Sequence, residues 1–286
     1  MTKGRQPFLT RRSRSYPPLL AAIHDPPGRL FLRGEGSVEM LSRPAAAVVG
    51  TRSCSPYGAQ VARRLGRELA AAGVTVVSGL ARGIDAEAHR GALEAGGPTV
   101  AVLGCGIDRD YPRAHAALAR RIAEVGLLVS EYEPGVEPAP WRFPARNRII
   151  AGLAGATVIV EARERSGALI TADFALEDGR EVFAVPGEIS SALSRGTNEL
   201  LRLGAAPLLG PGDVLAALGL EDAPARSVAR LSEQARRVRE LLADHSASID
   251  ELIECSGLAA NAVAAALVEL ELAGEAVCAE GVYRIG

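Results

Sequence analysis

Six short apolar segments, each about the length of a β-strand, alternate with longer helix-like segments between Ala45 and Leu218. They are rich in β-branched residues and end in small or turn-forming ones: AAAVVG, VTVVSG, TVAVLG, GLLVS, ATVIVEA and EVFAVPG. Strands that are apolar along their whole length are typical of a parallel sheet covered by helices on both faces. The alternation therefore predicts a doubly wound α/β domain, in which ligands bind at the carboxyl ends of the strands.

A second, smaller domain is predicted at the end of the chain. Three helix-like patterns, at 232–244, 248–257 and 259–274, precede two strand-like segments, which is the plan of a winged helix. Ser248 and Glu251 have the spacing of a helix capping box. A polar, proline-containing stretch before them is typical of a linker. The expected divisions are an N-terminal segment, the α/β domain, the linker and the winged helix, over residues 1–43, 44–219, 220–230 and 231–286.

Composition and charge exclude several classes of protein. The 48% apolar content supports real hydrophobic cores, and the formal net charge of −2 excludes a polybasic coat, so any nucleic-acid contact must come from a local cluster. The four cysteines are widely spaced, which suggests neither a zinc site nor a disulfide framework. No apolar stretch has the length of a membrane span, and no apolar core follows the arginines near the N-terminus. We expect a cytoplasmic protein.

Two predicted strand ends carry glycine and arginine together. After the first strand, VVGTRSCSPYG places Gly50 and Arg52 before a helix start at Ser55-Pro56. After the second, VSGLARGIDAEAH places Arg82 and Gly83 before another helix. Helix N-termini beside arginines are suited to anions, so both turns are candidate phosphate sites. The alternative for the first turn is that Arg52 caps a carbonyl or lies in water.

The segment WRFPARNRIIAGLAG interleaves basic and aromatic residues in a chain that is only 4% aromatic. Arginines that follow phosphates, combined with rings that accept unstacked bases, are typical of single-stranded nucleic-acid binding. We therefore expect a loop that binds nucleic acid through Arg142, Phe143, Arg146, Asn147 and Arg148. The alternative is that the aromatic residues anchor the loop to the core while the arginines pair with Glu131, Glu133 or Glu137.

A third candidate anion site lies in EARERSGALITADF, where Ser166, Gly167 and Thr171 begin a helix at a strand end. The chain lacks a Walker A loop, and GCGIDR has Arg109 where a dinucleotide fingerprint has its third glycine. The four histidines are scattered without metal-ligand spacing, and no nucleophile elbow is present. We therefore expect no cofactor, no metal and no catalytic residue.

Taken in chain order, these strings resemble the DNA-processing protein A family. The resemblance begins at YPPLLAAIHDPPGRLFLRG (residues 16–34) and continues through VVGTRSCSPYG, VVSGLARGIDAEAH, AVLGCGIDRDYP, LVSEYEPG, FPARNRIIAGL, VIVEARERSGALITA and REVFAVPG to the winged-helix strings LVELELAGEAV and GVYR. It implies an extended Rossmann-type domain that binds single-stranded DNA as a homodimer. By the same resemblance, Arg52 matches the phosphate-binding arginine, residues 143 and 146–148 match the pocket-lining motif, and Ser166, Gly167 and Thr171 match its Ser-Gly-x-Leu-Ile-Thr turn.

The resemblance also implies a function. Members of the family protect incoming single strands, often act past single-strand-binding protein, and help load a RecA-type recombinase during natural transformation. Two departures limit the transfer: only 15 residues precede Tyr16, so we expect a truncated or reduced helical module there, and position 168 is alanine where the family commonly has serine.

Two other functions remain open from the residues. The first is a nucleotide-processing enzyme similar to phosphoribohydrolases, although here Pro186-Gly187 and Gly196-Thr197 are separated by eight residues. The second is a winged-helix regulator. Its expected recognition helix contains no lysine or arginine and carries Glu269, Glu271 and Glu275, so we expect the winged helix to serve protein contacts or stability rather than duplex reading.

Overall fold

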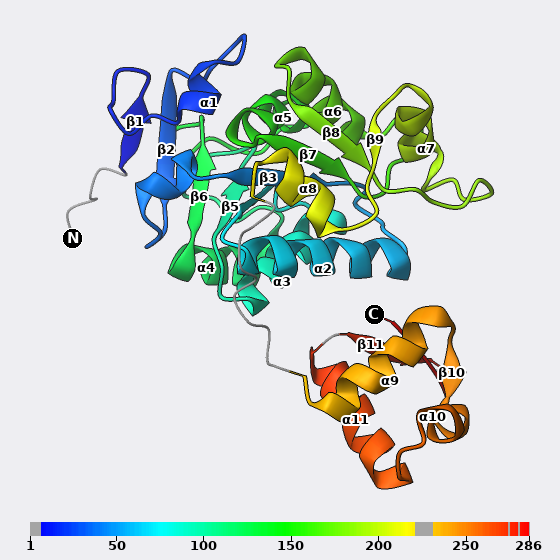
Figure 1. Cartoon of the computed structure of the whole chain (residues 1–286). Helices are drawn as coiled ribbons and strands as arrows, with labels where there is room; N and C mark the ends of the chain where they lie inside the picture. The colour runs from blue at the N-terminus through cyan, green and yellow to red at the C-terminus, as the bar shows by residue number, and fades with distance from the viewer. Residues whose placement is uncertain (1–6, 221–230, 274, 280, 286) are drawn as a thin grey trace. The chain divides into compact units, whose positions relative to one another are not determined.

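The computed structural model describes residues 7–220, 231–273, 275–279 and 281–285. The chain divides into two compact units, one over residues 1–225 and the other over residues 226–286 (Figure 1). Apart from Leu220, the expected linker lies outside the described residues.

A nine-stranded sheet forms the centre of the first unit, in the order β1-β2-β6-β5-β4-β3-β7-β8-β9. The strands are β1 (Phe8–Thr10), β2 (Arg29–Arg33), β3 (Ala45–Val49), β4 (Thr75–Ser78), β5 (Thr99–Val102), β6 (Leu127–Ser130), β7 (Ala156–Ile159), β8 (Glu181–Ala184) and β9 (Ala206–Pro207). From β6 to β9 in this order all pairings are parallel. The six predicted strands correspond to β3–β8, so the predicted doubly wound α/β class is confirmed.

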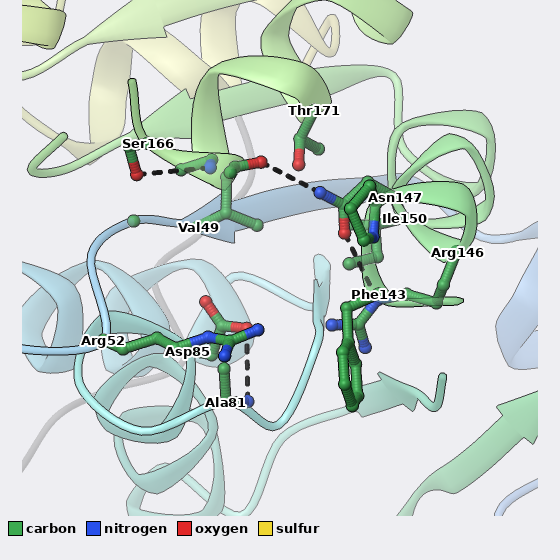
Figure 2. A pocket seen from close by; sticks show the side chains of 14 residues that line it. Val49, Arg52, Ala81, Asp85, Phe143, Arg146, Asn147, Ile150, Ser166 and Thr171 are labelled. Atoms are coloured by element: carbon green, nitrogen blue, oxygen red, sulfur yellow. Dashed lines mark hydrogen bonds between the residues drawn. The ribbon is translucent and has the colours of Figure 1, made fainter. Parts of the chain in front are cut away.

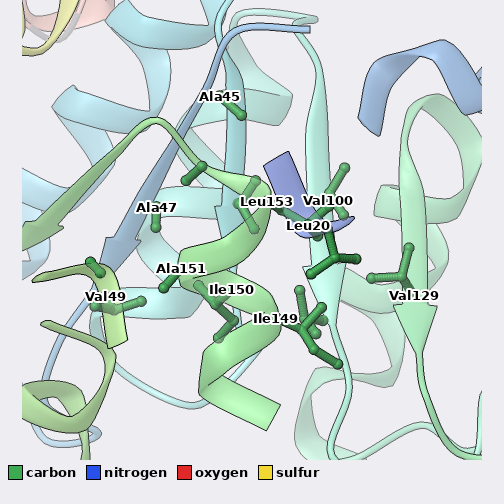
Figure 3. Packing of buried hydrophobic residues seen from close by; sticks show 14 of the residues in the cluster. Leu20, Ala45, Ala47, Val49, Val100, Val129, Ile149, Ile150, Ala151 and Leu153 are labelled. Atoms are coloured by element: carbon green, nitrogen blue, oxygen red, sulfur yellow. The ribbon is translucent and has the colours of Figure 1, made fainter. Parts of the chain in front are cut away.

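Helices cover both faces of this sheet. They are α1 (Pro18–Ala21), α2 (Pro56–Ala71), α3 (Ile84–Glu94), α4 (Ala116–Val125), α5 (Arg142–Leu153), α6 (Gly167–Glu177), α7 (Arg195–Arg202) and α8 (Pro211–Ala217), with 3₁₀ turns at Val38–Ser42 and Arg113–His115. Alternate side chains of β3 point to opposite faces, as the two-residue period of a strand requires. Ala47 and Val49 pack with α1, α5 and α6, and Figure 3 shows them beside α5. Val48 packs with α2 and α3.

Residues 142–153 form helix α5, although we expected their first half to be a loop. The sequence shows no helical periodicity here because the helix is packed on most sides: α5 contacts β3, β4 and β5 as well as α1 and α6. Buried residues therefore occur around most of its circumference, and no amphipathic period appears. Pro144 falls in the first turn, where a missing backbone N–H is tolerated.

The N-terminal segment extends the sheet. Where we expected a reduced helical module, β1 pairs antiparallel with β2, and β2 pairs antiparallel with β6. Buried Tyr16 fastens this segment internally, because its hydroxyl donates to the carbonyl oxygen of Pro27 at 2.7 Å. Parallel and antiparallel strands thus share one sheet.

The second unit contains helices α9 (Glu233–Asp244), α10 (Ile249–Ser256) and α11 (Ala260–Ala273) with strands β10 (Ala247–Ser248), β11 (Ala276–Ala279) and β12 (Val282–Ile285). The strands pair antiparallel in the order β10-β12-β11. The predicted winged helix is confirmed, with the short β10 as an addition. The capping box is also present, since the Ser248 N–H donates to the Glu251 carboxylate at 2.7 Å.

No single helix in the described parts of the chain has the length and hydropathy of a membrane span. Helices α10 and α11 meet that criterion only as a pair, with a bend of 115° between them.

Burial of His89 makes the stability of the first unit dependent on pH. His89 lies on α3, its Nδ1 is 2.8 Å from the hydroxyl of Thr99, and burial lowers the pKa of its imidazole from 6.5 to about 3. Below pH 6.5 the imidazole of His89 binds a proton in the unfolded chain but not in the folded chain. The free energy of unfolding therefore falls as the pH drops below 6.5. We expect His89 to contribute a slope approaching about 1.4 kcal/mol per pH unit between these two values.

The change His89→Gln keeps a hydrogen-bonding group and should remove this part of the slope. The matched control is His24→Gln, at an exposed position, which should retain the wild-type slope. Urea unfolding at a series of pH values, followed by the fluorescence of Trp141, measures the effect in this unit, because Trp141 is the single tryptophan of the chain. An unchanged slope in His89→Gln would contradict this assignment.

Candidate functional site

The order of the strands creates a crevice at one edge of the sheet. The chain proceeds from β3 to β4 on one side and from β7 to β8 on the other, so the loops after β3 and β7 diverge. Ligands of such sheets bind in the crevice that results at the carboxyl ends of the strands. A cavity of about 230 Å³ lies here, lined from the segments 49–52, 81–85, 143–150 and 166–171 (Figure 2).

Arg52 projects into this crevice directly after β3. Its side chain is exposed, and its guanidinium lies 5.4 Å from the centroid of the Phe143 ring, within the range of a cation–π contact (Figure 2). Gly50 allows the turn to approach its neighbours, because a Cβ there would lie 2.6 Å from Ile84. The structure thus gives Arg52 a position to meet a ligand and Gly50 a packing role beneath it.

The N-terminus of α2 is already occupied by a carboxylate of the protein. Ser55 caps this helix as predicted, accepting a hydrogen bond from the Gly58 N–H at 3.0 Å. Buried Glu161, which follows β7, accepts from the Ser55 N–H at 2.9 Å and also from the Ser55 hydroxyl. Negative charge near a helix N-terminus is favourable. The helix end that we expected to attract a phosphate beside Arg52 is therefore satisfied internally.

The loop from residue 79 to residue 83 is held in a strained conformation at the same edge. Leu80 has a left-handed backbone, with φ at 59°, although its side chain is fully buried. Its carbonyl is hydrogen-bonded to His115 Nδ1 at 2.9 Å. Gly83 has φ at 75°, and a Cβ there would lie 2.3 Å from the Thr51 carbonyl oxygen. This loop therefore depends on glycine at position 83, and it presents Arg82 to solvent.

Arg146 is buried beneath the crevice. It is 4% exposed, and its Nη1 donates to the carbonyl oxygens of Gly79, at 2.8 Å, and of Val102. Burial lowers the pKa of its guanidinium to about 10, so it remains charged at neutral pH. Buried Asp85 accepts from the N–H groups of Gly79 and Ala81 at 3.1 and 3.3 Å. Burial raises the pKa of Asp85, while the charge of Arg146 opposes that rise.

The other predicted residues of α5 have different surroundings. Arg148 forms ion pairs with Glu131 at 2.7 Å and Asp25 at 3.1 Å, which bears out the alternative pairing for this arginine. Asn147 donates from its amide to the carbonyl of Gly167 at 3.0 Å, which ties α5 to the start of α6. Arg142 lies over the rings of Tyr132 and Trp141 and donates to the Glu137 carbonyl.

The N-terminus of α6 closes the opposite side of the cavity from Arg52 (Figure 2). Ser166 caps the helix, since its hydroxyl accepts from the Ala168 N–H at 3.3 Å. Thr171 is buried in the next turn and also lines the cavity. Because Gly167 has open space where a Cβ would be, its first-turn backbone is sterically accessible. A helix N-terminus in this position favours an anion.

A second cavity of about 220 Å³ shares Arg52, Phe143 and Arg146 with the first. Its further lining includes Arg82 and Tyr111, and Tyr111 precedes a cis peptide bond to Pro112. We did not predict a role for Tyr111. Its position in the sequence could have indicated one, because Tyr111 follows the third predicted strand and so lies at the same carboxyl edge of the sheet as Arg52 and Arg82.

The structure brings most of the predicted site residues together. Those lining one or both cavities are Gly50, Arg52, Arg82, Phe143, Arg146, Asn147, Ser166, Gly167 and Thr171. Those lining neither are Gly83, Arg142 and Arg148. Across the described ranges, no group of three or more histidine, cysteine, aspartate or glutamate side chains is placed to hold a metal ion.

Comparison with known proteins matches both units of the chain to one family. The model of the family described as DNA recombination-mediator protein A matches residues 7–219, and that of the DprA winged helix domain matches residues 222–281. The chain is 45% identical over 264 residues to a putative DNA processing protein DprA of Mycobacterium tuberculosis, covering 90% of this chain and 68% of the relative. It is 44% identical over 282 residues to Protein Smf of Escherichia coli K12, covering 95% and 75%.

Two solved structures are also similar. DNA processing protein A of Streptococcus pneumoniae superposes with a TM-score of 0.71 at 44% identity, covering 74% of each chain. A DNA processing protein A of Helicobacter pylori, described for its single-stranded DNA binding mode, superposes with a TM-score of 0.66 at 32% identity, covering 74% of this chain and 95% of that one.

Removing the Arg146 guanidinium should destabilise the first unit. Arg146→Met leaves two strand-end carbonyls without their donor and deprives the buried Asp85 carboxylate of the nearby positive charge, at an expected cost of about 3 kcal/mol. The same change in an Asp85→Asn background should cost less, because the two sites are coupled. Arg82→Met, at an exposed position, is the control and should stay within about 0.5 kcal/mol of wild type.

Urea unfolding followed by Trp141 fluorescence measures these differences. Equal stability of Arg146→Met and wild type would show that the buried guanidinium is not what holds this edge of the sheet.

Proposed function

Because the chain belongs to the DNA-processing protein A family, we propose that it binds single-stranded DNA in the crevice between the loops that follow β3 and β7. One observation carries this proposal: exposed Arg52 lies against the Phe143 ring at the mouth of a cavity that ends at the α6 N-terminus. Cationic groups and backbone N–H groups bind the phosphates of a single strand, and an aromatic ring binds its unstacked bases.

The charges of the crevice support a phosphate ligand. Arg52 and Arg82 are exposed, and Arg146 contributes its positive charge from below. The carboxylate of Glu161 is engaged at the α2 N-terminus, and that of Asp85 accepts two backbone N–H groups. The positive charge of Arg148, by contrast, is balanced by Glu131 and Asp25. We therefore assign phosphate contacts to Arg52 and Arg82, and a supporting role to Arg146.

A single strand fits the crevice better than a duplex does. Its unpaired bases can enter narrow cavities and meet aromatic rings, whereas the bases of a duplex are stacked and paired. The expected recognition helix α11 contains no lysine or arginine. Its Glu269 caps α9, accepting from the Ser232 N–H and hydroxyl at 2.7 Å each. We assign the winged helix to protein contacts or stability.

The wider role that we propose is that of a recombination mediator in the cytoplasm. The protein would act as a homodimer that protects incoming single strands, works past single-strand-binding protein and loads a RecA-type recombinase during natural transformation. The description of the matching family as a recombination mediator supports this role. Support for single-strand binding comes from the similar Helicobacter pylori structure.

We propose binding rather than catalysis. In the phosphoribohydrolase-like alternative, the segments around Gly187 and Gly196 would form a phosphate turn with a glutamate. Here Asn198 fastens those segments together by hydrogen bonds to both backbone groups of Gly187, and Glu199 pairs with Arg202 at 2.5 Å on the surface. Incubation with nucleoside monophosphates would reveal released base if the alternative were correct.

Binding should prefer single strands and depend on Arg52. We expect a labelled oligo-dT to bind more tightly than a matched duplex, with a logarithmic salt dependence near −0.7 per neutralised phosphate. Arg52→Ala should weaken binding and flatten that dependence by about one contact. The matched control is Arg121→Ala, at an exposed position on α4 that lines neither cavity, which should behave as wild type.

Fluorescence anisotropy across a salt series measures both quantities. Wild-type protein that binds neither DNA form, or an Arg52→Ala variant with unchanged affinity and slope, would refute the proposed site.

A further inference from the structure

The ring of Phe143 lies at the boundary between the two cavities, since it lines both. It already has two neighbours: the Arg52 guanidinium at 5.4 Å and the Tyr111 ring at 5.3 Å, which is stacked with an interplanar angle of 22°. Tyr111 is the more accessible of the two rings, with 40% of its surface exposed, and it lines only the second cavity. The outer ring of this stack is therefore the one placed to receive a further planar group.

The second cavity suits one nucleotide unit. Among the described residues that line it, three are arginines and none is acidic, so its ligand should be anionic. Its volume of about 220 Å³ is below the roughly 300 Å³ at which sites for drug-sized ligands begin. A planar aromatic wall requires a ligand with a flat face, because stacked rings are favoured at such contacts. A base with its adjoining phosphate has all three properties.

We propose that Tyr111 stacks on a base of the bound strand in the second cavity, with Arg82 at the adjoining phosphate. The site then holds at least two neighbouring nucleotides, one on each side of Arg52 and Phe143. This inference rests on the proposed single-strand binding and adds a second subsite to it. Other exposed aromatic residues lack this setting: Tyr57 and Trp141 are more exposed than Tyr111, yet neither lines either cavity.

The test compares variants of Tyr111 on two strands by fluorescence anisotropy. One strand is oligo-dT, and the other has the same length and backbone but carries an abasic sugar at every position. Tyr111→Ala should weaken binding to oligo-dT by roughly 5- to 150-fold, the range for loss of one base–aromatic stack. Its salt dependence should stay that of wild type because no charge is removed. On the abasic strand Tyr111→Ala should equal wild type. Tyr111→Trp should bind oligo-dT more tightly than Tyr111→Ala does, because it restores an aromatic ring at this position. The matched control, Tyr57→Ala, should leave both affinities unchanged.

A double variant separates stacking by Tyr111 from mere support of Phe143. If Tyr111 contacts a base itself, Tyr111→Ala weakens oligo-dT binding further in a Phe143→Ala background. No further loss in that background, equal loss on the abasic strand, or wild-type affinity of Tyr111→Ala for oligo-dT would each overturn the subsite, while the dependence on Arg52 would remain. Failure of the wild-type protein to bind oligo-dT would instead overturn the proposed function on which the subsite rests.

Discussion

The guanidinium of Arg146 lies buried at the carboxyl edge of the sheet and donates to the carbonyl of Gly79, directly after β4, and to that of Val102, which ends β5. This contact fixes α5 over the strands whose loops form the crevice. It also requires glycine at position 79, where a Cβ would lie 2.5 Å from the guanidinium and 2.7 Å from the Asp85 carboxylate. An unpaired buried charge is costly, so the loop, the helix and the carboxylate must keep their arrangement together. This shared arrangement places Arg52 and Phe143 in contact across the crevice.

A second constraint directs anions within the crevice. Among the helices that begin at this edge, α2 and α6 flank the cavity from β3 and β7, and each offers backbone N–H groups at its N-terminus. Glu161 fills the end of α2 from within the protein, so the end of α6 is the one left facing the cavity. We infer that the backbone of the bound DNA strand passes from Arg52 toward Ser166 on one side and toward Arg82 on the other.

Much of this arrangement follows from the sequence, because strand composition and capping are local properties. Apolar β-branched segments predicted β3–β8. Ser55 and Ser248 cap helices as predicted, and α6 begins directly after Ser166, where the sequence indicated a helix start. The burial of α5 is a tertiary property, so neither its helical form nor the difference between buried Arg146 and paired Arg148 could be predicted. The stack of Tyr111 on Phe143 joins segments that are 32 positions apart, and no local pattern marks it.

Mapping where a single strand contacts the protein tests directly whether DNA binds in the crevice. An oligo-dT with one 5-iododeoxyuridine, irradiated in complex with the full chain and digested, reports contacts by mass spectrometry. We predict crosslinks in peptides that contain Arg52, Tyr111 or Phe143, and loss of those crosslinks when an unlabelled single strand competes. Crosslinks confined to residues 231–285, with none around the crevice, would contradict it.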